Sequence, residues 1–423
     1  MIHRSFIFPA TLLAAFAVTL ATGKPSKPNV VFILADDMGW NDAALYGSKF
    51  YQTPNIDALA KRGMKFNQAY SASPLCSPTR SSLMTGLYPA RTGITTASCH
   101  EPVEVLEKGL MPSATAKQKA IAAKGVNRLK TSYYTLGEAF KNAGYATGHF
   151  GKWHLGPEPY SPLQQGFDVD VPHTSAPSPL PKGFFYPFPV WKNHGKSGDN
   201  LEDLLADEAV KFIEANKEHP FFLNYWSFEV HSPWQAKETQ IDKYRGKADP
   251  ASPQRNPVYA GMVETLDEVV GRLVAALDKA GVLDNTIIVF TSDNGTTHMA
   301  ADPKFGIGGV DAAFFNSTAG FRGFKGSVFE GGLRVPMIVR YPAAVKAGSV
   351  SDVVGYFADW FPTLCAACDL KTPEKLDGIN LWPAITGEGK AAERNPLLWV
   401  YPEYGGQVAV RIGDKKVLRR NLK

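Results

Sequence analysis

Three short apolar runs, each followed closely by polar residues, constrain the fold of this 423-residue chain more than any other feature. They lie at residues 29–35 (NVVFILA), 221–228 (FFLNYWSF) and 286–291 (TIIVFT). Apolar runs of this length are typical of parallel strands that are buried on both faces. Strands of this kind need helices on both sides of their sheet, so the runs predict an α/β domain.

Helical signals fill the segments between these runs. Pro54 and Gly63 bracket one short helix, and Thr135 and Glu138 have the spacing of a capping box. We expect helices at residues 54–62, 76–85, 135–143, 200–217, 257–280 and 359–368, and further strands at 145–150 and 337–341. Residues 100–130 and 157–199 lack a sustained period and are expected to form long loops or insertions. The alternation predicts a large, mostly parallel central sheet that is flanked by helices.

The composition is that of a globular protein and excludes two other classes. With 44% hydrophobic and 20% charged residues, the chain is neither a disordered polymer nor a bundle of membrane helices. Its formal net charge of +5 is small and dispersed, so we expect no nucleic-acid partner.

The N-terminus has the pattern of a secretory signal peptide. His3 and Arg4 precede an apolar run at residues 6–20, and small residues follow at 21–23. The run is shorter than the ~20 residues that a spanning helix needs, and an uncleaved anchor is the alternative. We therefore expect removal of residues 1–23, export to the periplasm or secretion, and no stable membrane span after cleavage.

Each of the three apolar runs leads into polar residues of types that can bind ions or transfer protons. Asp36 and Asp37 follow the first run, His231 the second, and Asp293 and Asn294 the third. Ligands of open α/β sheets bind at the carboxyl ends of the strands, so these side chains are expected to converge. Their oxygen donors favour Ca²⁺, with Mg²⁺ possible, over a transition metal. The structural alternatives are a helix cap for the Asp pair and a turn for Asp-Asn-Gly.

Residues 76–86 (CSPTRSSLMTG) predict a helix whose N-terminus carries a reactive group. Pro78 suits the first turn, and Gly86 suits the end of the helix. Cys76 then lies where unpaired N–H groups and the macrodipole favour negative charge, and Arg80 points back toward it from one turn further on. A group that handles an anion is expected here, with a buried structural thiol as the alternative.

Four more side chains are candidates for an anion-binding lining. Lys152 and His154, in the segment GKWHLG, are two residues apart and share one face if that segment is extended. His231 and Lys325 add a protonatable group and a positive charge. Together with Arg80, these groups would suit a tetrahedral oxyanion.

The order of these motifs resembles that of the type I, formylglycine-dependent sulfatases, a family that includes arylsulfatases and N-acetylgalactosamine-6-sulfatases. The resemblance rests on the Asp pair at 36–37, CSPTR at 76–80, GKWHLG at 151–156, HSPW at 231–234, Asp-Asn at 293–294, Lys-Gly at 325–326 and EGGLRVP at 330–336. It extends from about residue 27 to residue 387.

This resemblance implies a role for each candidate residue. In that family a formylglycine-generating enzyme oxidises the cysteine to formylglycine, whose hydrated aldehyde attacks the sulfur of the sulfate ester. The implied metal ligands are Asp36, Asp37, Asp293, Asn294 and the residue made from Cys76. The implied catalytic residues are Cys76, Arg80, His154, His231 and Asp293, and the implied substrate-binding residues are Lys152, His154, His231 and Lys325.

The proton transfers are implied as well. Asp293 helps to remove the proton of the attacking hydroxyl, and His231 protonates the departing oxygen. His154 takes the proton of the remaining hydroxyl, while Arg80 orients the hydrated aldehyde.

The resemblance also implies an alkaline-phosphatase-like α/β sandwich. Its catalytic domain would span residues 24–387, and a small antiparallel subdomain, abbreviated or truncated relative to the family, would span 388–423. The implied activity is that of an exported sulfatase acting on a sulfated carbohydrate or an aryl sulfate. Two alternatives stay open: a phosphonate or phosphodiester hydrolase of the same superfold, and a non-catalytic glycan-binding relative.

Overall fold

A computed structural model describes residues 27–113, 121–179, 183–188, 191–192, 194–249, 251–297, 317–394 and 396–422. The signal peptide predicted at residues 1–23 lies outside this range. Within the described residues, no helix has both the length and the apolar character that crossing a membrane requires.

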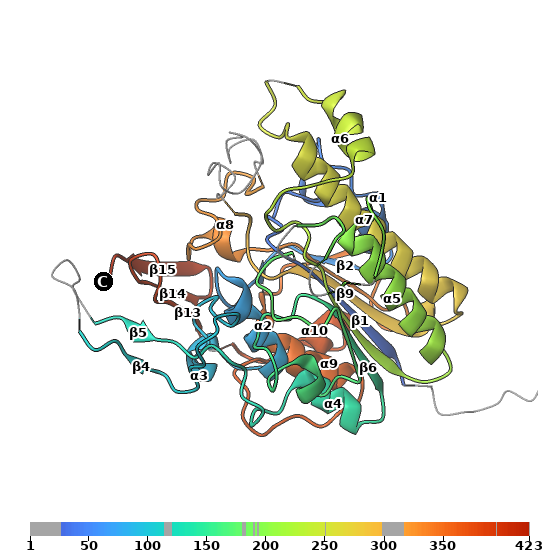
Figure 1. The fold of residues 1–423 in the computed structure, drawn as a ribbon. Coiled ribbons are helices and arrows are strands. Elements are labelled where there is room, and N and C mark those ends of the chain that lie inside the picture. Colours follow the sequence, from blue (N-terminus) through green and yellow to red (C-terminus); the bar gives the residue numbers. More distant parts are fainter. Residues whose placement is uncertain are drawn as a thin grey trace, which may run out of the picture.

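An eight-stranded sheet runs through the centre of the structure in the order β11-β2-β10-β9-β1-β8-β6-β7 (Figure 1). Its strands are β1 (Asn29–Ala35), β2 (Met64–Phe66), β6 (Ala146–Gly151), β7 (Val169–Val171), β8 (Phe221–Trp226), β9 (Thr286–Ser292), β10 (Met337–Arg340) and β11 (Ser349–Ser351). Strand β10 is antiparallel to both of its neighbours, and the other pairings in this sheet are parallel. The predicted mostly parallel sheet is therefore confirmed.

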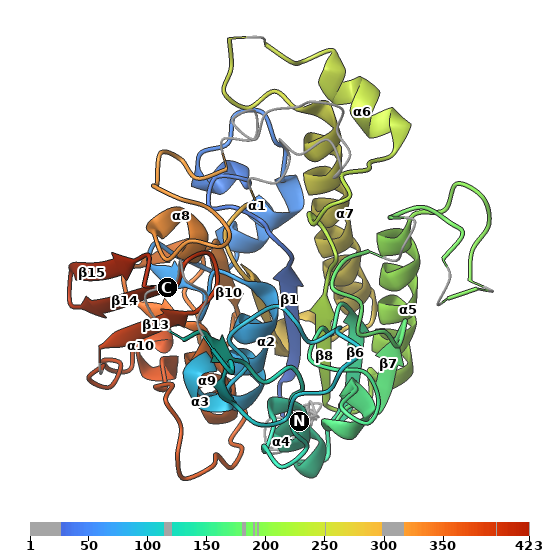
Figure 2. The same cartoon turned by 60° about the vertical axis from the view of Figure 1, so that its left-hand side comes forward.

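Helices cover both faces of the sheet, as the apolar runs require. Helices α1 (Pro54–Lys61), α5 (Leu201–Asn216) and α7 (Pro257–Lys279) lie on one face, and α2 (Cys76–Thr85), α4 (Leu136–Asn142) and α9 (Trp360–Ala367) lie on the other (Figures 1 and 2). Successive side chains of β1 enter opposite cores: Val30, Phe32 and Leu34 pack on one side, and Val31, Ile33 and Ala35 on the other. Both cores exclude water from this strand, which explains why its sequence is apolar without alternation.

The predicted elements appear within two residues of their expected ends. The capping box forms before α4, where the Glu138 N–H donates to Thr135 Oγ1 at 3.2 Å and the Thr135 N–H donates to Glu138 Oε2 at 2.8 Å. Strand β8 ends at Trp226, two residues before the predicted limit, because the chain then turns toward the candidate site. The other α-helices of the described part are α3 (Pro89–Thr92), α6 (Glu238–Arg245), α8 (Glu330–Leu333) and α10 (Trp382–Thr386).

The predicted loop regions are mainly irregular. Between residues 100 and 130, the described part contains only the short strand pair β4 (Gly109–Leu110) and β5 (Ala123–Lys124). Within 157–199, the described residues form a 3₁₀ turn and strand β7, which is one of the two edge strands of the central sheet.

A three-stranded antiparallel sheet near the C-terminus lies against the main domain (Figures 1 and 2). It consists of β13 (Leu397–Tyr401), β14 (Gln407–Ile412) and β15 (Lys415–Arg420). Trp399 Nε1 donates to the carbonyl oxygen of Ser71 at 2.9 Å, which ties this sheet to the segment just before α2. The antiparallel character expected for the C-terminal subdomain is confirmed. A two-stranded pair of β3 (Ala69–Tyr70) and β12 (Gly355–Tyr356) lies nearby in the fold.

Candidate active site

The candidate site lies at the carboxyl ends of three adjacent strands, β9, β1 and β8. In the parallel register, Ala35 of β1 lies beside Ser292 of β9, so the residues that follow both strands emerge together. The Asp37 N–H donates to Asp293 Oδ1 at 3.2 Å, and the Val230 N–H donates to the carbonyl oxygen of Asp36 at 2.7 Å. The convergence predicted from the three runs is confirmed.

Cys76 begins helix α2 and faces this strand edge, as the sequence predicts. The helix ends before Gly86, which adopts a left-handed conformation with φ of 68°. The Leu75 side chain provides no cap for the first turn. Cys76 is only 2% exposed, and its Sγ lies 3.6 Å from Asp36 Oδ1.

Arg80 holds the Asp293 carboxylate in place from one turn further along α2. Its Nε and Nη2 both donate to Asp293 Oδ2, at 2.9 and 2.7 Å, and its Nη1 donates to the carbonyl oxygen of Lys152 at 2.6 Å. The guanidinium also lies 5.1 Å from the ring centroid of Trp226. Arg80 is fully buried, so this arrangement fixes both the charge and the orientation of Asp293.

Two lysines from distant parts of the chain bind the aspartates that follow β1. Lys152, just after β6, places its Nζ 2.5 Å from Asp36 Oδ2. Lys325 places its Nζ 2.7 and 2.8 Å from the two carboxylate oxygens of Asp37. The three carboxylates of Asp36, Asp37 and Asp293 are thus balanced by the positive charges of Lys152, Lys325 and Arg80. A bound divalent cation would make the net charge of the cluster positive, which favours an anionic substrate.

Burial sets the protonation of several groups in the cluster. It raises the pKa of Cys76 to about 12, so the thiol stays protonated near neutral pH. Burial, with the Lys325 charge, lowers the pKa of His231 to about 3. Burial favours a higher pKa for Asp37, but the charges of Lys325 and His231 outweigh it and lower that pKa. Burial raises the pKa of Asp36 to about 7 against the opposing charge of Lys152.

A metal-binding geometry is present, although its members differ in part from the predicted ligands. Ligand atoms of Asp36, Asp37, Cys76 and His231 lie within 4.8 Å of one another. The Asp293 carboxylate is turned toward Arg80 instead. Asn294 Nδ2 donates to Asp37 Oδ1 at 2.7 Å, while Asn294 Oδ1 is buried and accepts no hydrogen bond within the described residues. An orphaned oxygen of this kind is costly unless a further partner, such as a cation, binds it.

Lys152 and His154 would share one face if their segment were extended, and the structure shows that it is not. Strand β6 ends at Gly151, whose φ is 106°, and His154 has a φ of 53°, so the chain turns sharply here. His154 Nε2 instead lies 3.1 Å from Nδ1 of His100. The sequence does not identify His100 as a site residue, because it lies in a stretch without periodicity or a recognisable motif.

The loop that carries Lys325 is held by a residue that the sequence did not single out. Gln407 of β14 donates from Nε2 to the carbonyl oxygen of Gly326 at 2.8 Å and accepts the Val328 N–H on Oε1 at 3.3 Å. The Lys325 N–H itself donates to the carbonyl oxygen of Thr296 at 2.8 Å. The C-terminal sheet therefore helps to position a cation of the candidate site.

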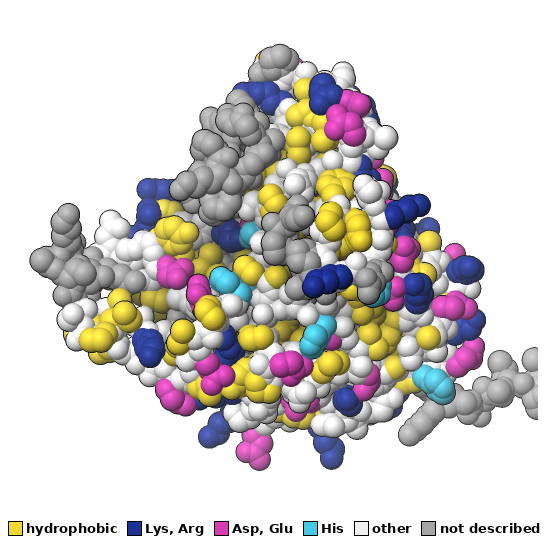
Figure 3. Space-filling view, viewed as in Figure 1, with side chains coloured by type: hydrophobic (Ala, Val, Ile, Leu, Met, Phe, Trp, Pro, Cys, Tyr) yellow, Lys and Arg dark blue, Asp and Glu magenta, His cyan; other side chains and the backbone are white. Residues whose placement is uncertain are grey.

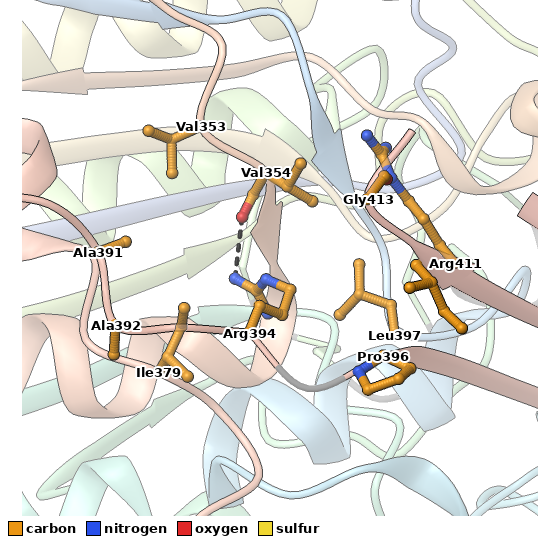
Figure 4. A pocket seen from close by; sticks show the side chains of 11 residues that line it. Val353, Val354, Ile379, Ala391, Ala392, Arg394, Pro396, Leu397, Arg411 and Gly413 are labelled. Carbon is orange, nitrogen blue, oxygen red and sulfur yellow. Dashed lines mark hydrogen bonds between the residues drawn. The ribbon is translucent and has the colours of Figure 1, made fainter. Parts of the chain in front are cut away.

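A separate apolar cavity of about 270 Å³ lies beside the C-terminal sheet (Figure 4). Val353, Val354, Ile379 and Leu397 line it, and Arg394 donates across it to the carbonyl oxygen of Val354 at 2.9 Å. It shares no residue with the cluster around Cys76 and offers no comparable set of carboxylates and lysines. The candidate active site is the strand-end cluster.

Comparison with known proteins agrees with the motifs and the geometry. Residues 28–370 match the profile of the family described as Sulfatase. The N-acetylgalactosamine-6-sulfatase of Sus scrofa is 34% identical over 395 residues, which cover 88% of this chain and 68% of that protein. Arylsulfatase A of Homo sapiens is 30% identical, with coverage of 96% and 77%. The crystal structure of Ps i-CgsB has a TM-score of 0.75 and 30% identity, with coverage of 94% and 84%.

The fold expected from the motifs is therefore the observed one, an alkaline-phosphatase-like α/β sandwich with a small C-terminal antiparallel sheet. The family profile spans most of the chain, and both curated relatives are named as sulfatases. The chain belongs to the sulfatase family and is a sulfuric ester hydrolase.

Proposed function

We propose that this chain is an exported, formylglycine-dependent sulfatase that removes sulfate groups from sulfated carbohydrates. The observation that carries the proposal is the arrangement around Cys76. Three buried carboxylates and three cations meet at the start of α2 and the ends of β1, β8 and β9. Such a charge-dense, water-poor site suits the binding of a small anion and the stabilisation of charge during its transfer.

The residues in this cluster fit a divalent metal ion. Asp36 and Asp37 offer hard oxygen donors, and Asn294 Oδ1 lacks a partner within the described residues. We propose Ca²⁺, with Mg²⁺ as the alternative, held by Asp36, Asp37, Asp293, Asn294 and the residue derived from Cys76. When bound, such an ion supplies positive charge that polarises a sulfate oxygen.

Formylglycine would supply chemistry that the Cys76 thiol lacks. The thiol is buried and protonated, so it is a weak nucleophile, whereas a hydrated aldehyde offers two hydroxyl groups. Cys76 is inaccessible in the folded chain, so a formylglycine-generating enzyme is expected to act before the domain folds.

The cations and histidines then bind and orient the sulfate ester. Lys152 and Lys325 point into the cluster and would hold sulfate oxygens, and Arg80 would orient the nucleophile beside Asp293. Arg80 binds one oxygen of Asp293 twice, which leaves Oδ1, with its single 3.2 Å bond from Asp37, to take a proton.

His231 and His154 are proposed to move the remaining protons. His231 Nδ1 lies 2.6 Å from the carbonyl oxygen of Ser232 and therefore carries the hydrogen, which leaves Nε2 facing Asp37 at 3.7 Å. An anionic substrate beside His231 would raise its low pKa and favour a proton on Nε2 for the departing oxygen. His154 Nδ1 is buried without a partner among the described residues, and its Nε2 faces His100.

The relatives support a carbohydrate substrate. N-acetylgalactosamine-6-sulfatases are named for a sulfated amino sugar, and Ps i-CgsB was also crystallised with k-i-k-neocarrahexaose. We propose that this chain likewise acts on a sulfated oligosaccharide or polysaccharide and accepts small aryl sulfates. Residues 1–23 are proposed as its signal peptide, with a periplasmic or secreted mature protein, a catalytic domain at 24–387 and a C-terminal subdomain at 388–423.

The direct test is sulfate release from 4-nitrophenyl sulfate by protein co-produced with a formylglycine-generating enzyme. Cys76→Ala is expected to lower kcat/KM by about 10³-fold or more, because the nucleophile is lost. Cys365→Ala, which removes another buried thiol far from the cluster along the chain, is the matched control. Peptide mass spectrometry should find the aldehyde at residue 76, and EDTA should abolish activity until Ca²⁺ or Mg²⁺ is restored. Substantial activity of Cys76→Ala would refute the mechanism.

The same assay separates the alternatives. Faster turnover of phosphodiester or phosphonate esters than of 4-nitrophenyl sulfate would identify a phosphoryl-transfer enzyme of the same superfold. Tight binding of sulfated glycans without sulfate release by the formylglycine form would identify a binding protein.

A further inference from the structure

A second cavity, which is lined by positively charged side chains, lies directly beside the candidate active site. Its volume is about 250 Å³, and it is lined by the segment 322–327, by Phe329, and by Tyr404, Gln407 and Arg420 of the C-terminal subdomain. Lys325 belongs to this lining and also binds Asp37, so the cavity and the strand-end cluster share one wall. Figures 1 and 2 show α8, which follows this segment, beside the sheet of β13–β15.

Two arginines in this cavity have no carboxylate partner within the described residues. Arg322 and Arg420 both lie over the ring of Phe329, with guanidinium carbons 4.2 and 5.2 Å from its centroid. Two other arginines of the chain do have carboxylate partners: Arg334 Nη1 lies 3.8 Å from Glu330 Oε2, and Arg394 is paired with Asp359. The lining of the cavity in the described part contains three cations and no Asp or Glu.

The fold presents these two arginines together although they lie almost one hundred residues apart. Gln407 binds the loop after Lys325 through two hydrogen bonds. Arg420 is the cross-strand neighbour of Gln407 in the β14–β15 register, so it lies beside the same loop. Both guanidinium groups stack on the flat Phe329 ring, which orients them. Because a ring face accepts no conventional hydrogen bond from them, their N–H donors stay available for an anion. Figure 3 shows Lys and Arg side chains beside hydrophobic ones in the region above the C-terminal sheet.

We propose that Arg322 and Arg420 form a subsite for a second sulfate group of the glycan substrate, next to the sulfate that is hydrolysed. This inference rests on the proposed function and adds a substrate class, namely glycans that carry more than one sulfate group within reach of the site. Planar guanidinium groups bind sulfate oxygens through paired N–H donors, and the absence of competing carboxylates in the lining keeps them available. The C-terminal sheet thereby contributes to specificity as well as to the position of Lys325.

Binding measurements on a catalytically inactive chain test the subsite independently of turnover. In a Cys76→Ala background, isothermal titration calorimetry compares N-acetylgalactosamine 6-sulfate with N-acetylgalactosamine 4,6-disulfate, which differ by one sulfate group. The second sulfate is expected to tighten Kd by about tenfold, the scale of one to two charge-assisted hydrogen bonds. Arg322→Ala/Arg420→Ala should reduce this gain to less than about twofold, since both donors are removed.

Arg419→Ala is the matched control, because Arg419 is an exposed arginine of the same strand that precedes Arg420 and points to the opposite face. It removes one of the two positive charges that the double variant removes, but from the opposite face of the strand, and should keep the tenfold gain. In chains that retain Cys76, the Arg322/Arg420 double variant should hydrolyse 4-nitrophenyl sulfate, which has no second sulfate, with unchanged kcat/KM.

The proposal is overturned if the second sulfate gives no gain in the reference chain, or if the gain survives in the double variant. An equal loss in Arg419→Ala would also overturn it, because the effect would then be one of net charge alone. Failure of the proposed function has a different signature, namely no sulfate release from any ester by the formylglycine form, and leaves the binding comparison intact.

Discussion

The buried ion pair between Arg80 and Asp293 offers a quantitative test of the structure. Replacing Arg80 with Met removes the two donors, at 2.9 and 2.7 Å, that satisfy Asp293 Oδ2, and leaves that carboxylate fully buried. Removing one partner of a buried pair costs about 3–5 kcal/mol, because the remaining charge stays desolvated. We therefore expect Arg80→Met and Asp293→Asn each to lower the free energy of unfolding by about that amount.

The double variant separates a specific pair from general damage to the core. Arg80→Met/Asp293→Asn removes both charges of the pair, so neither is left buried without its partner. The loss of unfolding free energy in the double variant should therefore fall short of the sum of the two single losses by at least about 2 kcal/mol. Urea unfolding followed by tryptophan fluorescence, with EDTA present so that no metal substitutes for Arg80, measures all three variants.

The surface pair of Arg91 and Asp377 provides the control for burial. Its geometry is equally good, with Arg91 Nη2 2.6 Å from Asp377 Oδ1 and Nε 2.8 Å from Oδ2, but the Arg91 side chain is 62% exposed. Arg91→Met should cost only about 0.2–1 kcal/mol. The Asp377 side chain is 10% exposed beside Arg91, but it keeps the N–H of Tyr88 as a donor at 2.8 Å and gains access to water once the exposed guanidinium is removed. Equal losses for Arg80→Met and Arg91→Met, or additive effects of Arg80→Met and Asp293→Asn, would show that burial of this pair does not set the cost of breaking it.

Three further predictions concern the groups around the site. Gly151→Ala would place a Cβ against the carbonyl oxygen of Trp226 at a φ of 106°, and should lower the free energy of unfolding by about 2 kcal/mol or more in urea titrations; an unchanged midpoint would contradict it. Gln407→Leu removes both bonds to the loop of Lys325, and should cost about 2–4 kcal/mol and lower kcat/KM for 4-nitrophenyl sulfate by about tenfold; full activity would show that Lys325 holds its place without this brace. Burial raises the pKa of Glu202 to about 7 from 4.5, so the folded chain keeps a proton that the unfolded chain releases, and stability should fall by up to about 3 kcal/mol as pH rises through this interval. Glu202→Gln should remove that part of the pH dependence, and an identical slope in both proteins would assign it to other groups.

Much of the architecture was predictable because local sequence and tertiary burial agree. The runs at 29–35, 221–228 and 286–291 are apolar throughout because both faces of β1, β8 and β9 are covered, and the polar residues after them mark where the strands leave the core. The capping box at Thr135 and the glycine at 86 fix helix ends through contacts within a few residues. Such signals survive in a sequence without any knowledge of the fold.

The antiparallel insertion of β10 was not predictable by the same means. A buried strand has the same apolar composition whichever way it runs, so the segment 337–341 predicts a strand but not its direction. The turn at His154 was also missed, since a left-handed φ at a histidine leaves no compositional trace.

The sequence alone therefore determined which chemical groups this protein has and at which strand ends they emerge: Cys76 at a helix start, and aspartates after two buried strands. The partners of these groups depend on the tertiary fold, which pairs Lys152 with Asp36, Lys325 with Asp37 and Arg80 with Asp293. These pairs are 116, 288 and 213 residues apart in the chain. No local pattern encodes a contact over such separations, because it forms only when the packing of the sheet and its two helical layers brings the groups together and removes the water that would otherwise solvate them.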